Sequence, residues 1–264
     1  MWPEFSPGIV IPLALTALLY ARGSRRTFRL SRLRVASFWA GWLLLVIALL
    51  SPLHELGEQL FSAHMVQHEI LMVCAAPLLI VSRPMVPLLW GLPFQWRRAA
   101  GRMAKFKVFR GGWYLLTLPL VSWSVHALAL WIWHAPMLFQ ATLTHDWVHA
   151  AQHISFLGSA LLFWWSLLGS RKRIDNGAGI LYLFTTGVHT SILGALLTFT
   201  PSVWYPAYLS TAPRWGLTAL EDQQLGGLIM WVPAGIVYII AGLALLGNLL
   251  RSGQPVVPAS QFAE

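Results

Sequence analysis

Two copies of a short histidine motif carry the strongest chemical signal in the sequence. The pattern H-x-x-Q-H occurs at His64–His68 and again at His149–His153. Residues four apart lie on the same face of an α-helix, about 6 Å apart along its axis. Each pair of imidazoles can therefore converge on one point. Burying four imidazoles together is costly unless they share a ligand, so the two motifs predict a metal or cofactor site.

The remaining five histidines include three candidate metal ligands and two for which a structural role is favoured. His134 lies at the end of an apolar segment, and His126 is two turns earlier on that segment. His189 lies near the middle of another. A single histidine inside a membrane can simply bond a carbonyl or hydroxyl of a neighbouring helix, whereas many such residues are functional. For His54 and His145, in a loop and at a helix end, a structural role is favoured. The predicted metal ligands are His64, His68, His134, His149, His153, His126 and His189.

Among metals, the residue types favour copper. Imidazole suits copper, zinc, nickel and iron, and methionine thioethers favour Cu(I). Methionines occur near the histidines at positions 65, 72, 137 and 230. A zinc protease motif, H-E-x-x-H, needs glutamate after the first histidine. Met65 and Ala150 occupy those positions, so the sequence does not favour this protease class.

A second polar group opens the last apolar segment, in the run from Glu221 to Gln224. Asp222 is placed either to cap a helix N-terminus or to orient a ligating imidazole through its second nitrogen. Gly226 and Gly227 follow, and paired small residues allow close approach of helices in membranes. Both roles for Asp222 stay open, and in the second it would support the predicted metal site without being a ligand.

These residues must be positioned by membrane-spanning helices. The 264-residue chain is 57% hydrophobic and only 10% charged, whereas soluble domains carry roughly 25% charged residues. We expect an all-α polytopic bundle of about seven transmembrane helices, with residues 1–251 as one domain and 252–264 as a disordered cytoplasmic tail. The predicted spans lie near 7–21, 35–53, 62–82, 113–135, 147–168, 178–199 and 221–248.

The net charge of +9 reflects membrane topology rather than nucleic-acid binding. The basic residues form short blocks between apolar segments, and all but Arg214 fall on one side if seven spans alternate. Because basic loops face the cytoplasm, the N-terminus is predicted outside and the C-terminus inside. Every histidine then lies between the middle of the membrane and its outer surface. Lipid is an expected partner, and nucleic acid is not.

Four of these motifs, in order, resemble the caa3-type CtaG family of cytochrome c oxidase assembly proteins. They are His64–His68 with the later Ala76-Pro77, Trp133-His134 before Pro136, His149–His153 with the later Phe163-Trp164-Trp165, and Asp222-Gln223 through Met230-Trp231. The resemblance covers spans two to seven. It implies a non-enzymatic assembly factor in the bacterial cytoplasmic membrane. Its partner would be a haem–copper oxidase subunit, and its role would be copper insertion from a periplasm-facing His/Met site.

Two other functions fit parts of the pattern. A bis-histidine haem protein that transfers electrons could use His68 and His153 on facing helices. A copper or proton transporter would need polar groups through the cytoplasmic half of the membrane as well, and spans three to six offer few there.

Overall fold

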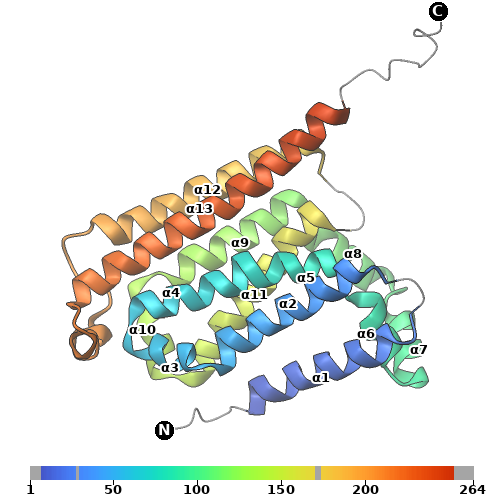
Figure 1. The fold of residues 1–264 in the computed structure, drawn as a ribbon, viewed down its shortest axis with the longest axis horizontal. Coiled ribbons are helices and arrows are strands. Elements are labelled where there is room, and N and C mark those ends of the chain that lie inside the picture. Colours follow the sequence, from blue (N-terminus) through green and yellow to red (C-terminus); the bar gives the residue numbers. More distant parts are fainter. Residues whose placement is uncertain (1–6, 28–29, 170–173, 253–264) are drawn as a thin grey trace, which may run out of the picture.

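The protein is a bundle of helices elongated along one axis, seen horizontally in Figure 1. The computed structural model describes residues 7–27, 30–169 and 174–252, and these contain no strand. The helices are α1 (Pro7–Ser24), α2 (Arg32–Leu50), α3 (Pro52–Gln59), α4 (Phe61–Glu69), the π-helix η1 (Ile70–Ala75), α5 (Ala76–Ser82), α6 (Met85–Gly91), α7 (Phe94–Met103), α8 (Lys107–Leu116), α9 (Pro119–Trp133), α10 (Pro136–Thr144), α11 (Asp146–Leu168), α12 (Asn176–Phe199), the 3-10 helices η2 (Pro206–Leu209) and η3 (Ala212–Trp215), and α13 (Ala219–Ser252).

The all-helical prediction is confirmed, and a helix covers each predicted span. Within the described ranges, five helical segments are long and apolar enough to cross a membrane, or six if the bent pair α8–α9 counts as one span. The remaining predicted span, the fifth (147–168), corresponds to α11, which has 23 residues. His149, Gln152 and His153 lower its mean hydropathy. Most of the predicted tail, residues 253–264, lies outside the described residues, as does the basic run at 171–173.

The predicted span 113–135 is not one straight helix. It is divided between α8 and α9, which meet at an angle of 67°. The break lies at Leu118, whose backbone is extended, and Pro119 is the first residue of α9. Proline has no N–H to donate and disfavours helical geometry in the residue before it. The bend follows from that one residue.

The span predicted at 35–53 also ends earlier than expected. The side chain of Ser51 caps a new helix, and Pro52 is the first residue of that helix. Residues 52–59 therefore form α3 instead of an open loop. At Gly57, α3 contacts α4 so closely that a Cβ would lie 3.3 Å from the Cα of His64. This turn brings His54 back toward α4.

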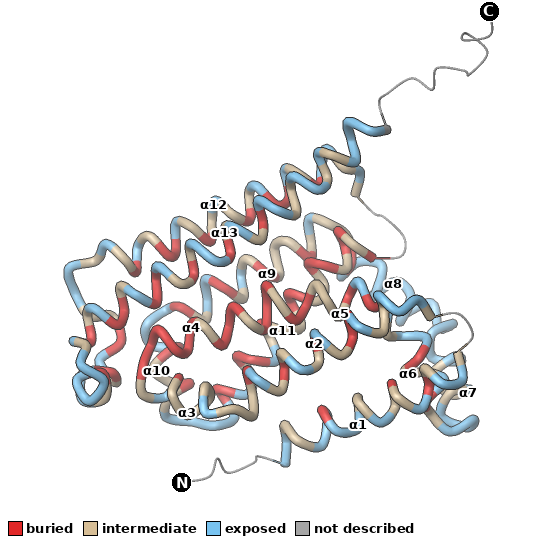
Figure 2. Tube along the Cα trace, viewed as in Figure 1, coloured by how far each residue is buried: buried red, intermediate tan, exposed pale blue. Residues whose placement is uncertain are grey.

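The continuous rod of α4, η1 and α5 is the centre of the bundle. Its span is 67% buried, whereas the other four candidate spans are between 17% and 39% buried, and Figure 2 shows the contrast along the tube. Proline causes the π-helical turn. The N–H of Ala76 donates to the Leu71 carbonyl, five residues back, and Pro77 cannot continue that register. The indole of Trp164 on α11 donates to the Met72 carbonyl instead, at 3.0 Å.

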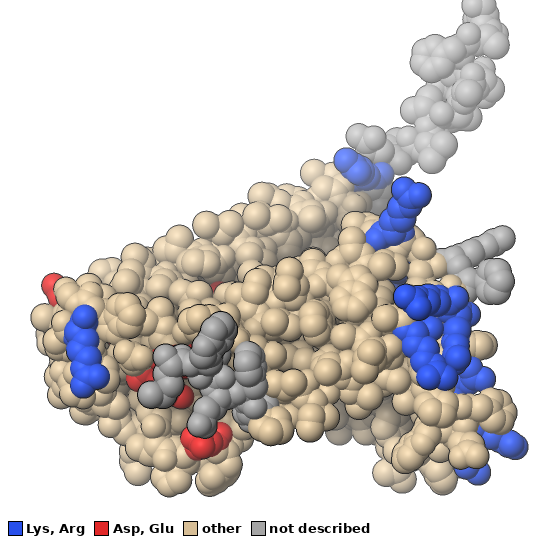
Figure 3. Space-filling view, turned by 60° about the horizontal axis from the view of Figure 1, so that its bottom comes forward, with Lys and Arg blue, Asp and Glu red and all other residues tan. Residues whose placement is uncertain are grey.

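The two ends of the bundle carry opposite charge. Lys and Arg side chains gather chiefly at the end formed by α6, α7 and α8, and Asp and Glu side chains appear toward the opposite end (Figure 3). We call these the basic end and the acidic end. The acidic end holds α3, α10, the N-terminus of α4 and the segment 200–218 (Figure 1). The histidine motifs therefore begin at the acidic end.

Candidate metal centre

The two H-x-x-Q-H motifs meet in the interior, and within each motif the two histidines lie side by side. His64 and His68 come from α4, and their ring centroids are 4.4 Å apart. His149 and His153 come from α11, with centroids also 4.4 Å apart. Across the interface, His68 and His153 are separated by 5.4 Å, and His64 and His149 are stacked at 5.2 Å. Four imidazoles from two helices thus form one group.

His54 is a fifth member of this group. Its ring stacks on His149 with centroids 5.1 Å apart, and it lies 6.0 Å from His153. The prediction of a structural role for His54 assumes that it lies in a loop. Residues 52–59 instead form the helix α3. The sequence signal for this helix is Ser51-Pro52, a helix cap followed by a proline at the first helical position. We call His54, His64, His68, His149 and His153 the histidine cluster.

Two overlapping groups in the cluster have metal-binding dimensions. One possible ligand atom from each of His64, His68 and His153 lies within 4.8 Å of the other two, and the same holds for His54, His149 and His153. Metal–imidazole bonds are about 2.0–2.1 Å long, so three ligand nitrogens around one ion lie about 3.3–3.6 Å apart. Small side-chain rotations would bring either triad to that distance. We call the first the inner triad and the second the outer triad.

The glutamine of each motif holds a histidine on another helix. The Oε1 of Gln152 lies 3.2 Å from the Nε2 of His64 and accepts a hydrogen bond from it. The amide nitrogen of Gln67 lies 3.0 Å from the Nδ1 of His54 and also donates to the Ala48 carbonyl at 2.7 Å. The shared glutamine position in the motif thus has a physical role, since each glutamine orients an imidazole of the cluster.

Several cluster nitrogens are buried and have no hydrogen-bond partner. They include both ring nitrogens of His68 and the Nε2 atoms of His149 and His153. His68 is 1% exposed. A buried polar atom without a partner costs about 1–3 kcal/mol, and lone pairs of this kind are what a metal ion requires. The donor set therefore fits a metal that prefers nitrogen ligands.

Asp222 supports the site by capping α4, which is not the helix it belongs to. Its Oδ2 accepts the N–H of Phe61 at 2.6 Å, and its Oδ1 accepts the N–H of Ser62 at 3.1 Å. Ser62 also donates its hydroxyl to the carboxylate. The residue before α4, Leu60, offers no side-chain cap. Asp222 therefore fixes the start of the helix that carries His64 and His68, and no described bond joins it to an imidazole.

The two glycines after Asp222 allow the close contacts that this capping needs. A Cβ at Gly226 would lie 2.3 Å from the ring of Phe61, and one at Gly227 would lie 2.7 Å from the Gly194 carbonyl on α12. Both contacts are shorter than side chains permit. The expectation that these glycines serve helix approach is confirmed.

The segment 200–218 covers the acidic end of the site. Tyr205 donates to the His134 carbonyl at 2.9 Å, and Tyr208 donates to the Gly57 carbonyl at 3.0 Å. Burial raises the pKa of both phenols, so both remain neutral donors. Through Gly57 and His134 this segment ties α3 and the end of α9 to the cluster.

His134 lies beside the cluster, separated from it by aromatic rings. Its ring is 6.4 Å from Phe139 and 6.0 Å from Phe156, and these two phenylalanines contact His64 and His68 at 5.0 and 4.6 Å. Its Nδ1 donates to the Leu130 carbonyl at 2.7 Å. Its Nε2 is buried without a partner. His134 therefore keeps a free ligand atom but belongs to neither triad.

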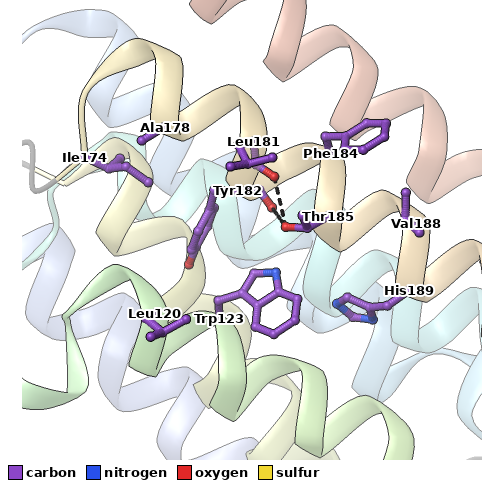
Figure 4. Close-up of a pocket in the computed structure, with 10 residues that line it drawn as sticks. All are labelled: Leu120, Trp123, Ile174, Ala178, Leu181, Tyr182, Phe184, Thr185, Val188 and His189. Carbon is purple, nitrogen blue, oxygen red and sulfur yellow. Dashed lines mark hydrogen bonds between the residues drawn. The ribbon is translucent and has the colours of Figure 1, made fainter.

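His126 and His189 lie elsewhere. The Nδ1 of His126 is 3.0 Å from the hydroxyl of Ser159. His189 packs edge-on against Trp123 at 5.3 Å and lines a largely apolar cavity of about 530 Å³, in which both rings are visible (Figure 4). Neither histidine belongs to the metal-sized groups found in the described part of the chain.

Three of the four methionines near the histidines pack among apolar side chains, and the fourth is exposed. Met65 and Met230 belong to a buried cluster with Phe61 and Phe139, Met72 lies in the main core, and Met137 is 88% exposed. The two metal-sized groups of the described residues consist of histidines. The site is therefore built from imidazoles.

The half of the bundle toward the basic end is more polar than the sequence suggested. The hydroxyl of Ser122 lies 2.8 Å from that of Ser166 and 3.0 Å from that of Tyr182. These groups also reach backbone carbonyls, with Ser166 donating to Thr117 at 3.1 Å and Tyr182 to Phe163 at 3.3 Å. Each of the three hydroxyls has a backbone acceptor nearby. The bonds between the hydroxyls join α9, α11 and α12.

Comparisons with known proteins point to one family. A family model described as cytochrome c oxidase caa3 assembly factor matches residues 16–252. The chain is 24% identical over 237 residues to an uncharacterized protein of Mycobacterium leprae and 26% identical over 234 residues to one of Mycobacterium bovis. Each alignment covers 84% of this chain, which spans about a third (35%) of the relative's length. No solved structure matches the chain.

Proposed function

The chain belongs to the cytochrome c oxidase caa3 assembly factor family, and on that premise we propose that its histidine cluster binds copper as cargo for the oxidase. The protein would act without catalysis, in the bacterial cytoplasmic membrane. It would receive copper at the acidic end of the bundle and pass it to a haem–copper oxidase subunit. Because basic loops usually face the cytoplasm, the acidic end would face the periplasm.

One observation carries the proposal. His64, His68 and His153 present three ligand atoms within 4.8 Å of one another in the buried interior, and His68 has no hydrogen-bond partner on either nitrogen. No hydrogen bond offsets the cost of burying the two His68 nitrogens, and a bound ion would offset it. Imidazole alone does not distinguish copper from zinc, so the choice of copper rests on the family.

The packing of the cluster favours an ion over haem. A haem held by His68 and His153 would have to place its macrocycle between their rings, whose centroids are 5.4 Å apart. Two other rings already contact His68: that of His64 at 4.4 Å and that of Phe156 on α11 at 4.6 Å. Both rings would have to be displaced. A Soret band in the purified protein would support the haem alternative.

The test is made in cells that depend on this protein for oxidase assembly. Deleting it is expected to lower the copper content and the activity of the purified oxidase, and expression of the full chain is expected to restore both. A His68→Leu variant present at the same level in the membrane should fail to restore them, whereas His145→Leu should succeed. Restoration of copper content by His68→Leu would contradict the proposal.

A further inference from the structure

We propose that the inner and outer triads are two successive stations for one copper ion, which passes between them by ligand exchange on His153. This inference rests on the proposed function, because it takes copper as the cargo. It adds a second metal position, assigns His54 a role in release and gives the ion a path to the surface.

His153 is the only residue common to both triads. A neutral imidazole has one unprotonated nitrogen, and the Nε2 of His153 is buried without a hydrogen-bond partner. That nitrogen can bind one ion at a time. The two triads therefore exclude each other. An ion that remains bound to His153 can exchange His64 and His68 for His54 and His149 without being released.

The ring arrangement supports a continuous path. His54, His149 and His64 form a stack in which His149 lies between the other two, with centroids 5.1 and 5.2 Å apart and interplanar angles of 13° and 17°. An ion leaving the inner triad thus meets His149 next and His54 after it. Each step is about the width of one ring, and His153 lies beside all of them.

Burial and hydrogen bonding make the two stations unequal. His64 and His68 are at most 1% exposed, and His149 and His153 are 7–8% exposed, while His54 is only partly buried. His54 is also engaged by Gln67 at Nδ1, so binding an ion requires that bond or the tautomer to change. The outer triad is therefore the weaker and more accessible site. The helix that carries His54, α3, also carries Glu55 and Glu58. Their negative charge favours a cation at this end of the path.

The experiment measures the rate of copper release. The purified full chain is loaded with one equivalent of Cu(I) and mixed with an excess of a water-soluble Cu(I) chelator. His54→Asn is the main variant, because the asparagine Oδ1 can still accept the Gln67 bond but supplies no ligand nitrogen. We expect release to slow by about tenfold or more, which corresponds to about 1.4 kcal/mol of added barrier. His149→Asn tests the outer triad from α11 and should show the same slowing.

His145→Ala is the matched control, because His145 is exposed one turn before His149 and bonds only locally, to Thr144. It should release copper at the wild-type rate. Wild-type release rates in both His54→Asn and His149→Asn would overturn the two-station path. Loss of the bound copper in His54→Asn would also overturn it, since His54 would then belong to the tight site. A wild-type chain that binds no Cu(I) would refute the proposed function itself.

Discussion

The carboxylate of Asp222 on α13 accepts the backbone N–H of Phe61, the first residue of α4, at 2.6 Å. Two residues 161 positions apart thereby join the last span to the helix that carries His64 and His68. A helix N-terminus has N–H groups without partners inside the helix, and α4 obtains its acceptor from a different helix. The position of the metal ligands therefore depends on the packing of α13.

Replacing Asp222 should weaken both the fold and the site. Asp222→Ala leaves the buried N–H groups of Phe61 and Ser62 without an acceptor, and loss of a helix cap costs about 0.5–2 kcal/mol. We expect a lower unfolding temperature in detergent and weaker copper binding. Glu221→Ala is the matched control. Glu221 accepts from Thr218 at the exposed start of its own helix, so it should leave copper affinity unchanged. Equal copper affinity in Asp222→Ala and wild type would contradict this role.

Adding one methyl group at Gly226 should displace α4. Its Cβ would lie 2.3 Å from a carbon of the Phe61 ring, and overpacking of this kind costs about 1–3 kcal/mol. Thermal denaturation of Gly226→Ala should show the loss. Gly235 lies on the same helix, and a Cβ added there would meet nothing within 4 Å, so Gly235→Ala should be neutral or stabilising. A Gly226→Ala protein as stable as Gly235→Ala would show that α4 and α13 are not in this contact.

Removing the imidazole of His68 should separate stability from metal binding. His68→Leu replaces two buried nitrogens without partners by an apolar side chain. The metal-free protein should therefore be as stable as wild type or more stable, by up to about 1–3 kcal/mol. Copper should no longer stabilise it, whereas copper should raise the unfolding temperature of wild type. A large loss of stability in the metal-free variant would instead indicate a structural role for His68.

The glutamine of the second motif should tune copper affinity without determining it. Gln152→Leu removes the acceptor that orients the Nε2 of His64. Supporting hydrogen bonds of this kind typically contribute about 10–100-fold to metal affinity, and a decrease of that size is expected in a competition titration with a Cu(I) chelator. Gln224→Leu loses only a bond to the Thr200 carbonyl and serves as the control. The same affinity in both variants would argue against a role for Gln152 in orienting the ligand.

Local sequence was sufficient to predict the helical framework and the convergence of the two histidines within each motif. The four-residue spacing of His64 and His68 fixes a shared helix face, and so does that of His149 and His153. Hydropathy locates the spans because a bilayer requires apolar segments of sufficient length. Neither prediction depends on how distant segments pack.

The remaining features depend on tertiary contacts. His54 enters the cluster because Pro52 starts a short helix that folds back against α4. The sequence placed Asp222 at a helix start, but only the structure shows that its hydrogen bonds go to α4. Depth in the membrane is the sequence signal that favours His126 and His189, and depth does not determine which side chains meet.

Copper binding by the histidine cluster is the central claim, and elemental analysis of the purified chain tests it most directly. After loading with Cu(I) and removal of the excess, the wild type should retain one copper per chain, and so should His145→Ala. A His64/His68/His153 triple alanine variant, shown to be folded by its helical circular dichroism, should retain none. Copper retained by the folded triple variant at the wild-type level would contradict copper binding at this cluster.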